Sequence, residues 1–248
     1  MRKIAFITGG TGGLGIAIIE QLLELGYEVV SVSQNPNKIE KAKKRLHSDK
    51  VTFFQGDITK EETLEEVYQH LLGTYGYVNV IINNVGTIVG GGIEDVSPEE
   101  WMHMFEVNVH VPYRVTKKML RLLKHAEYAS VTNISSIASK ITGGSMAYSA
   151  CKAAVDMMTQ SLAKELSKYY IRVNSVNPGV INTGFQVNNQ MMSEQEYDAF
   201  LEDAAKDYPM GIGSAEDVAS LVGYLVSKKA RWITGSNYVI DGGRSVNL

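Results

Sequence analysis

Short apolar segments alternate along the chain with longer segments in which apolar residues recur every three or four positions. The short segments are rich in Val and Ile and have the length of buried strands, whereas the longer ones have the period of an α-helix. The pattern predicts strands at residues 3–8, 28–32, 51–55, 78–83, 129–134, 171–176 and 237–240. It predicts helices at residues 13–25, 37–46, 60–75, 98–108, 109–124, 147–169 and 215–227.

This alternation is typical of a parallel sheet, because parallel neighbours are joined by crossovers that pack on a face of the sheet. Right-handed crossovers give a doubly wound α/β sheet of the Rossmann type, with helices on both faces. No linker, repeat or low-complexity tract divides residues 1–248, so we expect a single domain. Residues 184–208 are polar, contain methionines and include no strand-like run, and we expect a helical substrate lid there.

The composition argues against several classes of function. A formal net charge of −3 gives no electrostatic attraction to nucleic acid, and the apolar runs are too short to span a membrane. Cys151 is the only cysteine, so we expect no disulfide within the chain and a cytoplasmic location. The five histidines are scattered and the single thiol has no Cys partner, so we expect no metal site.

A glycine-rich loop joins the first predicted strand to the first predicted helix. Glycines allow a tight turn there, and a diphosphate can approach the helix N-terminus, where free N–H groups favour an anion. The spacing fits two dinucleotide-binding patterns, one through Gly10, Gly12 and Gly15 and the other through Gly9, Gly13 and Gly15. The loop residues that we expect against the cofactor are Gly9, Thr11, Gly13, Leu14 and Gly15. A phosphate-loop NTPase is excluded, because no Gly-Lys-Ser/Thr follows the loop.

The residues after the second strand bear on the choice of cofactor. Dinucleotide sites for NAD place an acidic residue about 20 positions after the loop, where it binds the ribose hydroxyls. Here the chain has Ser33, Gln34 and Asn35 instead, with Lys38 nearby. A carboxylate would repel a 2′-phosphate, and its absence favours NADP(H), with NAD(H) as the alternative. Ser33 and Gln34 are the expected hydrogen-bond donors to that phosphate.

Polar residues also follow the third and fourth strands, at the sheet edge where ligands bind in open α/β sheets. Asp57, followed by Ile58, is placed to accept a hydrogen bond from the adenine amino group. Its alternative role is to cap the next helix, although Thr59 is better placed for that. Asn84 and Gly86 are expected along the cofactor, or alternatively in an ordinary polar turn.

The candidate chemistry lies at Tyr148 and Lys152, four residues apart and therefore on one helix face. An ammonium beside a phenol lowers the phenol pKa from its ordinary value near ~10 and makes the group a usable general acid or base. Ser135, thirteen residues before Tyr148, is expected to hold the substrate oxygen. The same Tyr-x-x-x-Lys spacing recurs at Tyr113 and Tyr224, but no serine lies thirteen residues before either of them.

Taken together, these segments resemble the short-chain dehydrogenase/reductase family over the whole chain. The resemblance rests on residues 8–15, Asp57, residues 83–86, Asn108, Ser135, Tyr148, Lys152, residues 177–179, Thr183, residues 233–235 and residues 241–243. It implies an NAD(P)-dependent enzyme that transfers hydride between the nicotinamide and a carbonyl or secondary alcohol.

The resemblance also implies a role for each site residue. Tyr148 exchanges the proton with the substrate, Ser135 stabilises the substrate oxygen, and Lys152 lowers the pKa of Tyr148 and binds the nicotinamide ribose. Asn108 holds a water that links Lys152 to solvent. The segment expected to anchor the nicotinamide comprises Pro178, Gly179, Val180, Ile181 and Thr183.

Two segments depart from the family pattern. Val85 stands where alanine is usual, and residues 209–213 are one residue shorter than the usual loop and lack its arginine, which puts closure of that loop in doubt. Many similar proteins reduce 3-oxoacyl groups carried by acyl carrier protein or coenzyme A, which makes that reaction the first specific expectation. Other ketones, sugars, steroids and polyketides are alternatives, as is a non-catalytic dinucleotide sensor. The resemblance further implies a homotetramer built on helices 109–123 and 147–169.

Overall fold

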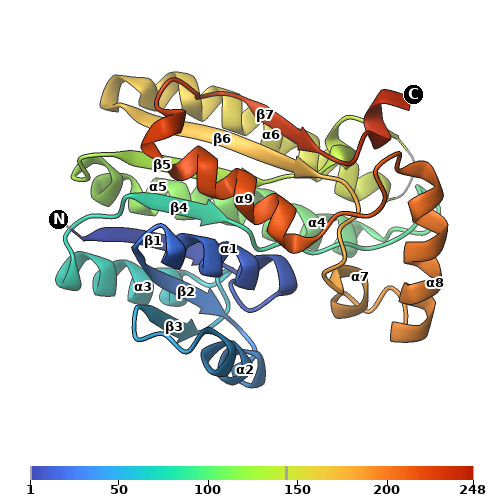
Figure 1. Cartoon of the computed structure of the whole chain (residues 1–248), viewed down its shortest axis with the longest axis horizontal. Helices are drawn as coiled ribbons and strands as arrows, with labels where there is room; N and C mark the ends of the chain where they lie inside the picture. Colours follow the sequence, from blue (N-terminus) through green and yellow to red (C-terminus); the bar gives the residue numbers. More distant parts are fainter. Residues whose placement is uncertain (1, 143–144, 248) are drawn as a thin grey trace.

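The fold is organised around one parallel sheet of seven strands in the order β3-β2-β1-β4-β5-β6-β7 (Figure 1). The structure is a computed structural model, which describes residues 2–142 and 145–247. The strands are β1 (Lys3–Thr8), β2 (Tyr27–Ser33), β3 (Val51–Gln55), β4 (Val80–Asn83), β5 (Ala129–Ile134), β6 (Ile171–Pro178) and β7 (Asn237–Ile240). The strand order reverses between β1 and β4, which confirms the predicted doubly wound topology.

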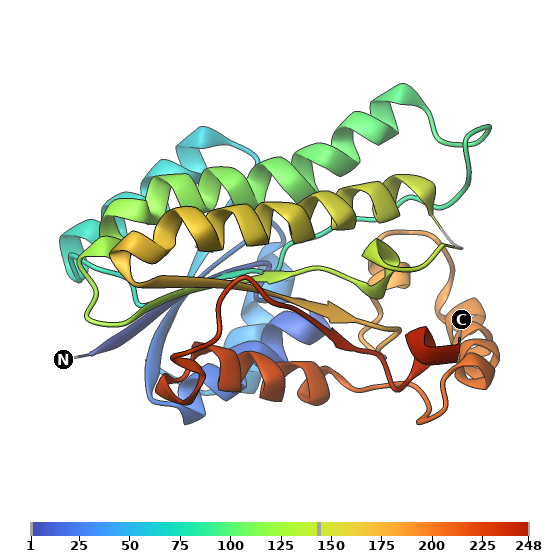
Figure 2. The same cartoon turned by 90° about the horizontal axis from the view of Figure 1, so that it is seen from above.

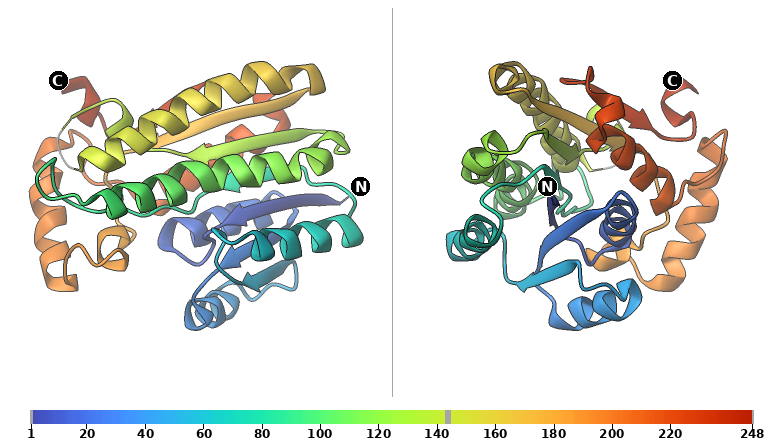
Figure 3. Two further views of the ribbon diagram at one scale, coloured as in Figure 1. Left: turned by 180° about the vertical axis from the view of Figure 1, so that it is seen from behind. Right: turned by 60° about the vertical axis from the view of Figure 1, so that its left-hand side comes forward.

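Helices cover both faces of the sheet, which is seen edge-on between them in Figure 2. The helices are α1 (Gly13–Glu24), α2 (Pro36–Leu46), α3 (Glu61–Thr74), α4 (Pro98–Phe105), α5 (Val111–Lys124), α6 (Met146–Leu166), α7 (Phe185–Asn188), α8 (Glu194–Ala204) and α9 (Ala215–Val226). One face carries α3, α5 and α6, which lie in front of the sheet in the left view of Figure 3. The opposite face carries α1 and α9.

Each face of the sheet has its own apolar core, and β1 contributes to both. Ile4 and Phe6 pack with α3 and α5 on one face, whereas Ala5 and Ile7 pack with α1 and α9 on the other. Successive side chains of a strand point to opposite faces, so a strand buried on both sides reads as a continuous apolar run. This explains why β1 and β4 appear in the sequence as nearly unbroken apolar segments.

The predicted helix boundary at Asn108 is wrong. The chain continues from α4 into α5 through a π-helical turn at Glu106–His110, and Val111 N donates to the carbonyl of Glu106, five residues back. Pro112 has no N–H to donate to the carbonyl of residue 108, so the regular i−4 pattern cannot continue through this point. The π-turn places Asn108 inside the protein, where only 1% of its surface is exposed.

A second correction concerns the start of α3. Thr59 does not cap this helix; its N-cap position is Lys60, and no side chain caps it. Thr59 instead donates from its N–H and its hydroxyl to the Asp57 carboxylate, at 2.9 and 2.8 Å. The predicted start of α4 is confirmed, because Ser97 and Glu100 form a reciprocal capping box.

Residues 184–208 form a helical segment at the carboxyl ends of the strands, as expected of a lid. It contains α7 and α8, and Figure 1 shows both beyond the tips of the central strands. Among the described residues, no helix is both long and apolar enough to cross a bilayer. Within the same residues, no group of three or more His, Cys, Asp or Glu side chains gathers as a metal-binding cluster.

Candidate active site

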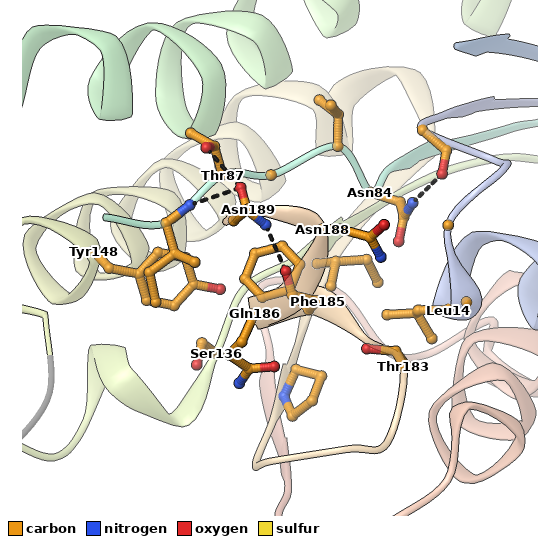
Figure 4. A pocket seen from close by; sticks show the side chains of 18 of the residues that line it. Leu14, Asn84, Thr87, Ser136, Tyr148, Thr183, Phe185, Gln186, Asn188 and Asn189 are labelled. Atoms are coloured by element: carbon orange, nitrogen blue, oxygen red, sulfur yellow. Dashed lines mark hydrogen bonds between the residues drawn. The ribbon is translucent and has the colours of Figure 1, made fainter. Parts of the chain in front are cut away.

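A cleft of about 850 Å³ opens at the carboxyl ends of the central strands, between the sheet and the lid (Figure 4). The sequence predicted most of the residues that line it. The predicted residues found in its wall are Gly9, Thr11, Gly13, Leu14, Gly15, Ser33, Gln34, Asp57, Ile58, Asn84, Gly86, Ser135, Tyr148, Lys152, Pro178, Gly179, Val180, Ile181 and Thr183. Asn108 lies outside the wall, behind Gly86.

The glycine loop favours one of the two predicted spacings. Gly9 has φ +69°, a side-chain carbon on Gly13 would lie 2.9 Å from the carbonyl oxygen of Thr183, and one on Gly15 would overlap the backbone of the loop. A side chain on Gly12 would meet nothing closer than 3.8 Å. The structure therefore requires glycine at the three positions of the Gly9, Gly13, Gly15 pattern, but not at Gly12.

The loop leads into α1, whose first turn is available to an anion. Gly12 occupies the N-cap position, and no side chain caps the helix. The backbone N–H groups of the first turn have no acceptor within the helix, and the helix dipole adds a partial positive charge there. This end of the cleft is suited to the diphosphate of a dinucleotide.

Beyond the loop, the polar residues of the cleft wall that follow β2 and β3 bond to one another or to the loop. Thr11 Oγ1 lies 3.1 Å from Ser33 Oγ. Partial burial raises the pKa of Asp57, but hydrogen bonds from Thr59 and Gln34 outweigh this effect and hold the pKa below its ordinary value. Asp57 is therefore a carboxylate at neutral pH, placed to accept a hydrogen bond from a ligand.

Two further polar residues close this end of the cleft. Asn35 caps α2 by accepting from the N–H groups of Asn37 and Lys38. The ammonium of Lys38 donates to Asn188 Oδ1, 2.5 Å away at the end of α7. The only lysine at this end of the described cleft thus contacts the lid.

At the other end, Tyr148 and Lys152 project from α6 into the cleft as predicted. Lys152 Nζ lies 5.2 Å from the centroid of the Tyr148 ring and donates to the carbonyl of Ile134 at 2.9 Å. Burial lowers the pKa of Lys152 to about 8, although the charge of Asp156 acts in the opposite direction. The ammonium is thus held next to the phenol but bonded to the end of β5.

The predicted lowering of the Tyr148 pKa is not found. Burial raises the pKa of this phenol above its ordinary value, and the nearby Ser136 side chain offsets only part of that increase. The cost of removing a phenolate from water exceeds the stabilisation that its neighbours provide. The phenol is therefore protonated at neutral pH, the form required of a proton donor.

The prediction for Ser135 is also corrected by the structure. Ser135 Oγ donates to the backbone carbonyl of Lys152 at 3.2 Å, and only 3% of the residue is exposed. Ser136 is the serine whose side chain lowers the pKa of Tyr148, and Figure 4 shows both side chains in the pocket. Neighbouring residues at a strand end point in opposite directions, so a count of thirteen residues could not tell which serine faces the tyrosine.

Asn108 is fully engaged with the protein backbone. Its Nδ2 donates to the carbonyls of Thr87 and Met104, both at 2.9 Å, and its Oδ1 accepts from Thr87 N at 3.3 Å. A side-chain carbon on Gly86 would lie 3.1 Å from Asn108 Oδ1 and 3.8 Å from Lys152 Nζ. Asn108 thus fixes the loop after β4 close to Lys152.

The lid contacts this same loop through residues that the sequence did not reveal. Thr87 Oγ1 and Ile88 N donate to Asn189 Oδ1 at 2.8 and 3.3 Å, and Asn189 Nδ2 donates to the carbonyl of Phe185 at 2.8 Å. Figure 4 shows Asn189 between Thr87 and Phe185. The Phe185 ring centroid lies 6.3 Å from that of Tyr148, so the lid packs against this tyrosine. The sequence feature that could have indicated this lid contact is the pair of asparagines at 188 and 189, in a stretch without strand character.

Two tyrosines of the lid region hold the loop after β6. Tyr208 Oη accepts from Val180 N at 2.8 Å, and Tyr197 Oη accepts from the N–H groups of Thr183 and Gly184 at 3.2 and 3.1 Å. These contacts fix the segment predicted to anchor the nicotinamide.

The two departures from the family pattern are accommodated. The short loop at residues 209–213 closes without an arginine, because Ile181 and Gly213 form a β-bridge and Asn182 N donates to the carbonyl of Gly213 at 3.0 Å. Val85 packs against the apolar core on the α5 side of the sheet.

The comparisons with known proteins agree with this geometry. Residues 9–245 match the model of a protein family described as enoyl-(acyl carrier protein) reductase, one of the short-chain dehydrogenase/reductases. The chain belongs to the short-chain dehydrogenase/reductase family. It is an oxidoreductase that uses a nicotinamide cofactor.

Relatives within the short-chain dehydrogenase/reductase family differ in the substrates that their names describe. An NADP-dependent (R)-specific alcohol dehydrogenase of Lentilactobacillus kefiri is 33% identical over 97% of this chain and 96% of its own. A 2,3-dihydro-2,3-dihydroxybenzoate dehydrogenase of Bacillus subtilis is 30% identical over 99% and 97%. A 3-oxoacyl-acyl-carrier-protein reductase of Pseudomonas aeruginosa is 29% identical over 97% and 96%.

The solved structures support the same family assignment. A structure of ElxO with NADP bound superimposes with a TM-score of 0.89 at 28% identity, over 99% of this chain and all of the other. The likeness extends over the sheet, the cleft and the lid, because nearly the whole chain is covered.

Proposed function

We propose that this short-chain dehydrogenase/reductase reduces a carbonyl compound to a secondary alcohol with NADPH, the whole chain acting as one catalytic domain. The observation that carries the proposal is the arrangement of Tyr148, Ser136 and Lys152 on one wall of a cleft whose other end is the uncapped N-terminus of α1. When bound, the nicotinamide cofactor supplies the hydride that adds to the carbonyl carbon.

The protein residues supply the proton and hold the substrate oxygen. Tyr148 is protonated at neutral pH and donates its phenol proton to that oxygen as the alcohol forms. Ser136, in place of Ser135, donates a hydrogen bond to the same oxygen and stabilises its developing negative charge. The positive charge of Lys152 stabilises the phenolate that remains on Tyr148.

Asn108 has a positioning role in this proposal. Its amide holds the backbone of Thr87, and that loop lies beside Lys152. In this proposal, the water that links Lys152 to solvent lies beside Asn108 and the loop at Thr87.

The choice of NADP(H) over NAD(H) rests on the adenosine end of the cleft. No carboxylate lies at residues 33–35, and Lys38 is the cation nearest to them in the described cleft wall. A dianionic 2′-phosphate is favoured by a lysine and would be repelled by a carboxylate. The Lentilactobacillus relative is named as NADP-dependent, and the ElxO structure contains NADP.

The substrate end of the cleft is mostly apolar. Its wall includes Val107, Ile141, Met191, Met192 and Phe200. Such a surface accepts an alkyl or aryl ketone, or the acyl chain of a thioester. A 3-oxoacyl thioester is the first specific substrate to test, because the Pseudomonas relative is named as a 3-oxoacyl reductase. Simple ketones, sugars, steroids and polyketide intermediates complete the panel.

We further propose that the active protein is a homotetramer. Met102, Tyr113 and Met157 lie exposed on α4, α5 and α6, and large exposed apolar side chains on neighbouring helices favour association. Light scattering after size exclusion measures the mass in solution, and a monomer would refute this proposal.

The experiment that tests the function is a screen of carbonyl compounds with NADPH and with NADH, in which nicotinamide absorbance is followed. We expect NADPH to be oxidised in the presence of at least one ketone or 3-oxoacyl thioester. Cofactor binding without turnover across the whole panel would refute the enzymatic proposal and favour a dinucleotide sensor.

A further inference from the structure

A buried carboxylate lies behind the catalytic wall of the cleft. Asp156 is on α6, four residues after Lys152, and only 4% of its surface is exposed. Its oxygens accept from Ser139 Oγ at 2.6 Å, from Asn177 Nδ2 at 2.8 Å and from Ser175 Oγ at 3.1 Å. Lys140 Nζ lies 2.9 Å from the same carboxylate.

Ionised groups are rarely buried without a reason, because their removal from water is costly. Burial raises the pKa of Asp156, but the interactions with Ser139, Lys140 and Asn177 bring it below its ordinary value. An apolar side chain at this position would fill the same space without that cost. The buried charge is therefore better explained by what it holds in place than by stability.

The partners of Asp156 lead directly to Ser136. Ser139 Oγ lies 2.8 Å from the carbonyl oxygen of Ser136, and Asn177 Nδ2 donates to that oxygen at 3.1 Å. Ser136 Oγ also accepts from Ala138 N at 3.1 Å, which fixes the start of the same short turn. The turn is thus fastened to α6 through Asp156 and to β6 through Asn177.

Ser139 and Asn177 contact the backbone carbonyl of Ser136. Ala138 N donates to its hydroxyl oxygen, which leaves the hydroxyl proton free to be donated in the cleft. A hydrogen-bond donor stabilises an oxyanion only when its position is fixed before the reaction. Without the carboxylate, Ser139 and Asn177 would lose the acceptor that orients them, and the turn would gain freedom. An error of about 1 Å at such a group lowers rates by on the order of 10²-fold.

We propose that Asp156 is a positioning residue, which holds the turn at residues 136–140 so that the Ser136 hydroxyl faces the substrate oxygen. This proposal rests on the function proposed above. It concerns a residue that touches neither the cleft nor the cofactor loop, because Asp156 is absent from the described cleft wall.

The test is a double-mutant cycle between Asp156→Asn and Ser136→Ala. Asp156→Asn keeps the shape of the side chain and removes the charge, and we expect kcat to fall by about 10- to 100-fold. The NADPH dissociation constant, measured by quenching of protein fluorescence, should change by less than about threefold. If Asp156 acts through Ser136, the double variant should be no slower than Ser136→Ala alone.

Glu165→Gln is the matched control, because Glu165 is an exposed carboxylate on the same helix. It should leave kcat and the melting temperature unchanged. If Asp156→Asn does not fold, Ser139→Ala removes one of the two contacts to the Ser136 carbonyl and should show the same lack of additivity with Ser136→Ala.

The outcomes separate this inference from the proposed function. Full activity of Asp156→Asn in an active wild-type background would overturn the positioning role alone. Additive losses in the cycle, or a parallel loss of NADPH affinity and kcat, would show a general structural role instead. A wild-type protein that binds NADPH but turns over no substrate would overturn both proposals.

Discussion

Lys152 Nζ donates to the backbone carbonyl of Ile134 at 2.9 Å, while it lies 5.2 Å from the centroid of the Tyr148 ring. The lysine is therefore bonded to the last residue of β5, two positions before Ser136 in the sequence. One cation thus joins the helix that carries the tyrosine to the strand that leads into the serine turn. A buried cation with one carbonyl partner loses its proton more readily than an exposed lysine does.

The pH dependence of the reduction follows from this environment. Burial lowers the pKa of Lys152 from 10.5 to about 8, so the ammonium is present below that pH and is lost as the pH rises through it. Tyr148, whose pKa is raised, remains protonated over the same range. Because kcat/KM reports the ionisation of the free enzyme, we expect it to decline above about pH 8. A profile that stays flat to pH ~10, the ordinary range of lysine, would contradict this assignment.

The hydroxyl of Tyr148 is the group on which the proposed chemistry depends. We expect Tyr148→Phe to lower kcat by about 10²- to 10⁴-fold, because the proton donor is removed while the ring remains. NADPH affinity should stay within a few-fold. Tyr224→Phe is the matched control, since Tyr224 is exposed and Lys228 follows it at the same four-residue spacing. Equal rates for the two variants would remove Tyr148 from the mechanism.

The fold was predictable because its signal is local. β1 reads as a continuous apolar run because Ile4 and Ala5 are buried against different layers of helices, and β2 and β4 repeat this arrangement. The π-turn at Asn108 was missed, because the sequence on both sides has ordinary helical periodicity and only Pro112 marks the change.

The site was predictable only where spacing determines geometry. Tyr148 and Lys152 share a helix, so their separation fixes their relation. The choice between Ser135 and Ser136 depends on how the chain leaves β5, and the contact of Lys38 with Asn188 joins segments 150 residues apart. Neither the direction of a strand end nor a contact between distant segments is encoded in a local pattern.

The two serines at the end of β5 give a direct comparison. Ser136→Ala should lower kcat by about 10²- to 10³-fold, the usual effect of removing one donor to a developing oxyanion. Ser135→Ala should lower it far less, because the Ser135 hydroxyl is bonded to the Lys152 carbonyl and faces away from the tyrosine. Steady-state kinetics of both variants under saturating NADPH decides between them. A larger loss of kcat for Ser135→Ala would instead support Ser135, the serine thirteen residues before Tyr148, as the residue that holds the substrate oxygen.

Asn189 is expected to hold the lid over the cleft. Asn189→Ala removes two hydrogen bonds from the loop after β4, and each is worth a modest amount of free energy. We expect NADPH to dissociate about tenfold faster in a stopped-flow displacement experiment. Thr87→Val removes the hydroxyl partner and should raise the rate in the same direction. The effects of the two changes on the dissociation rate should be less than additive, because both changes break the hydrogen bond between Thr87 and Asn189. Fully additive effects would show that the two residues act separately.

Lys38 tests the choice of cofactor, because its two possible partners have different consequences. Its ammonium bonds to Asn188 on the lid, and it is also the cation placed to bind a 2′-phosphate. Loss of the lid contact would weaken the binding of NADPH and NADH alike, whereas loss of a phosphate contact would weaken the binding of NADPH alone.

We expect Lys38→Met to raise the dissociation constant of NADPH by about tenfold and that of NADH by less than twofold, since a charge-assisted hydrogen bond to phosphate is the stronger interaction. Fluorescence titration with both cofactors measures the ratio. An equal rise for the two would assign Lys38 to the lid and leave the preference for NADPH to the absence of a carboxylate at residues 33–35.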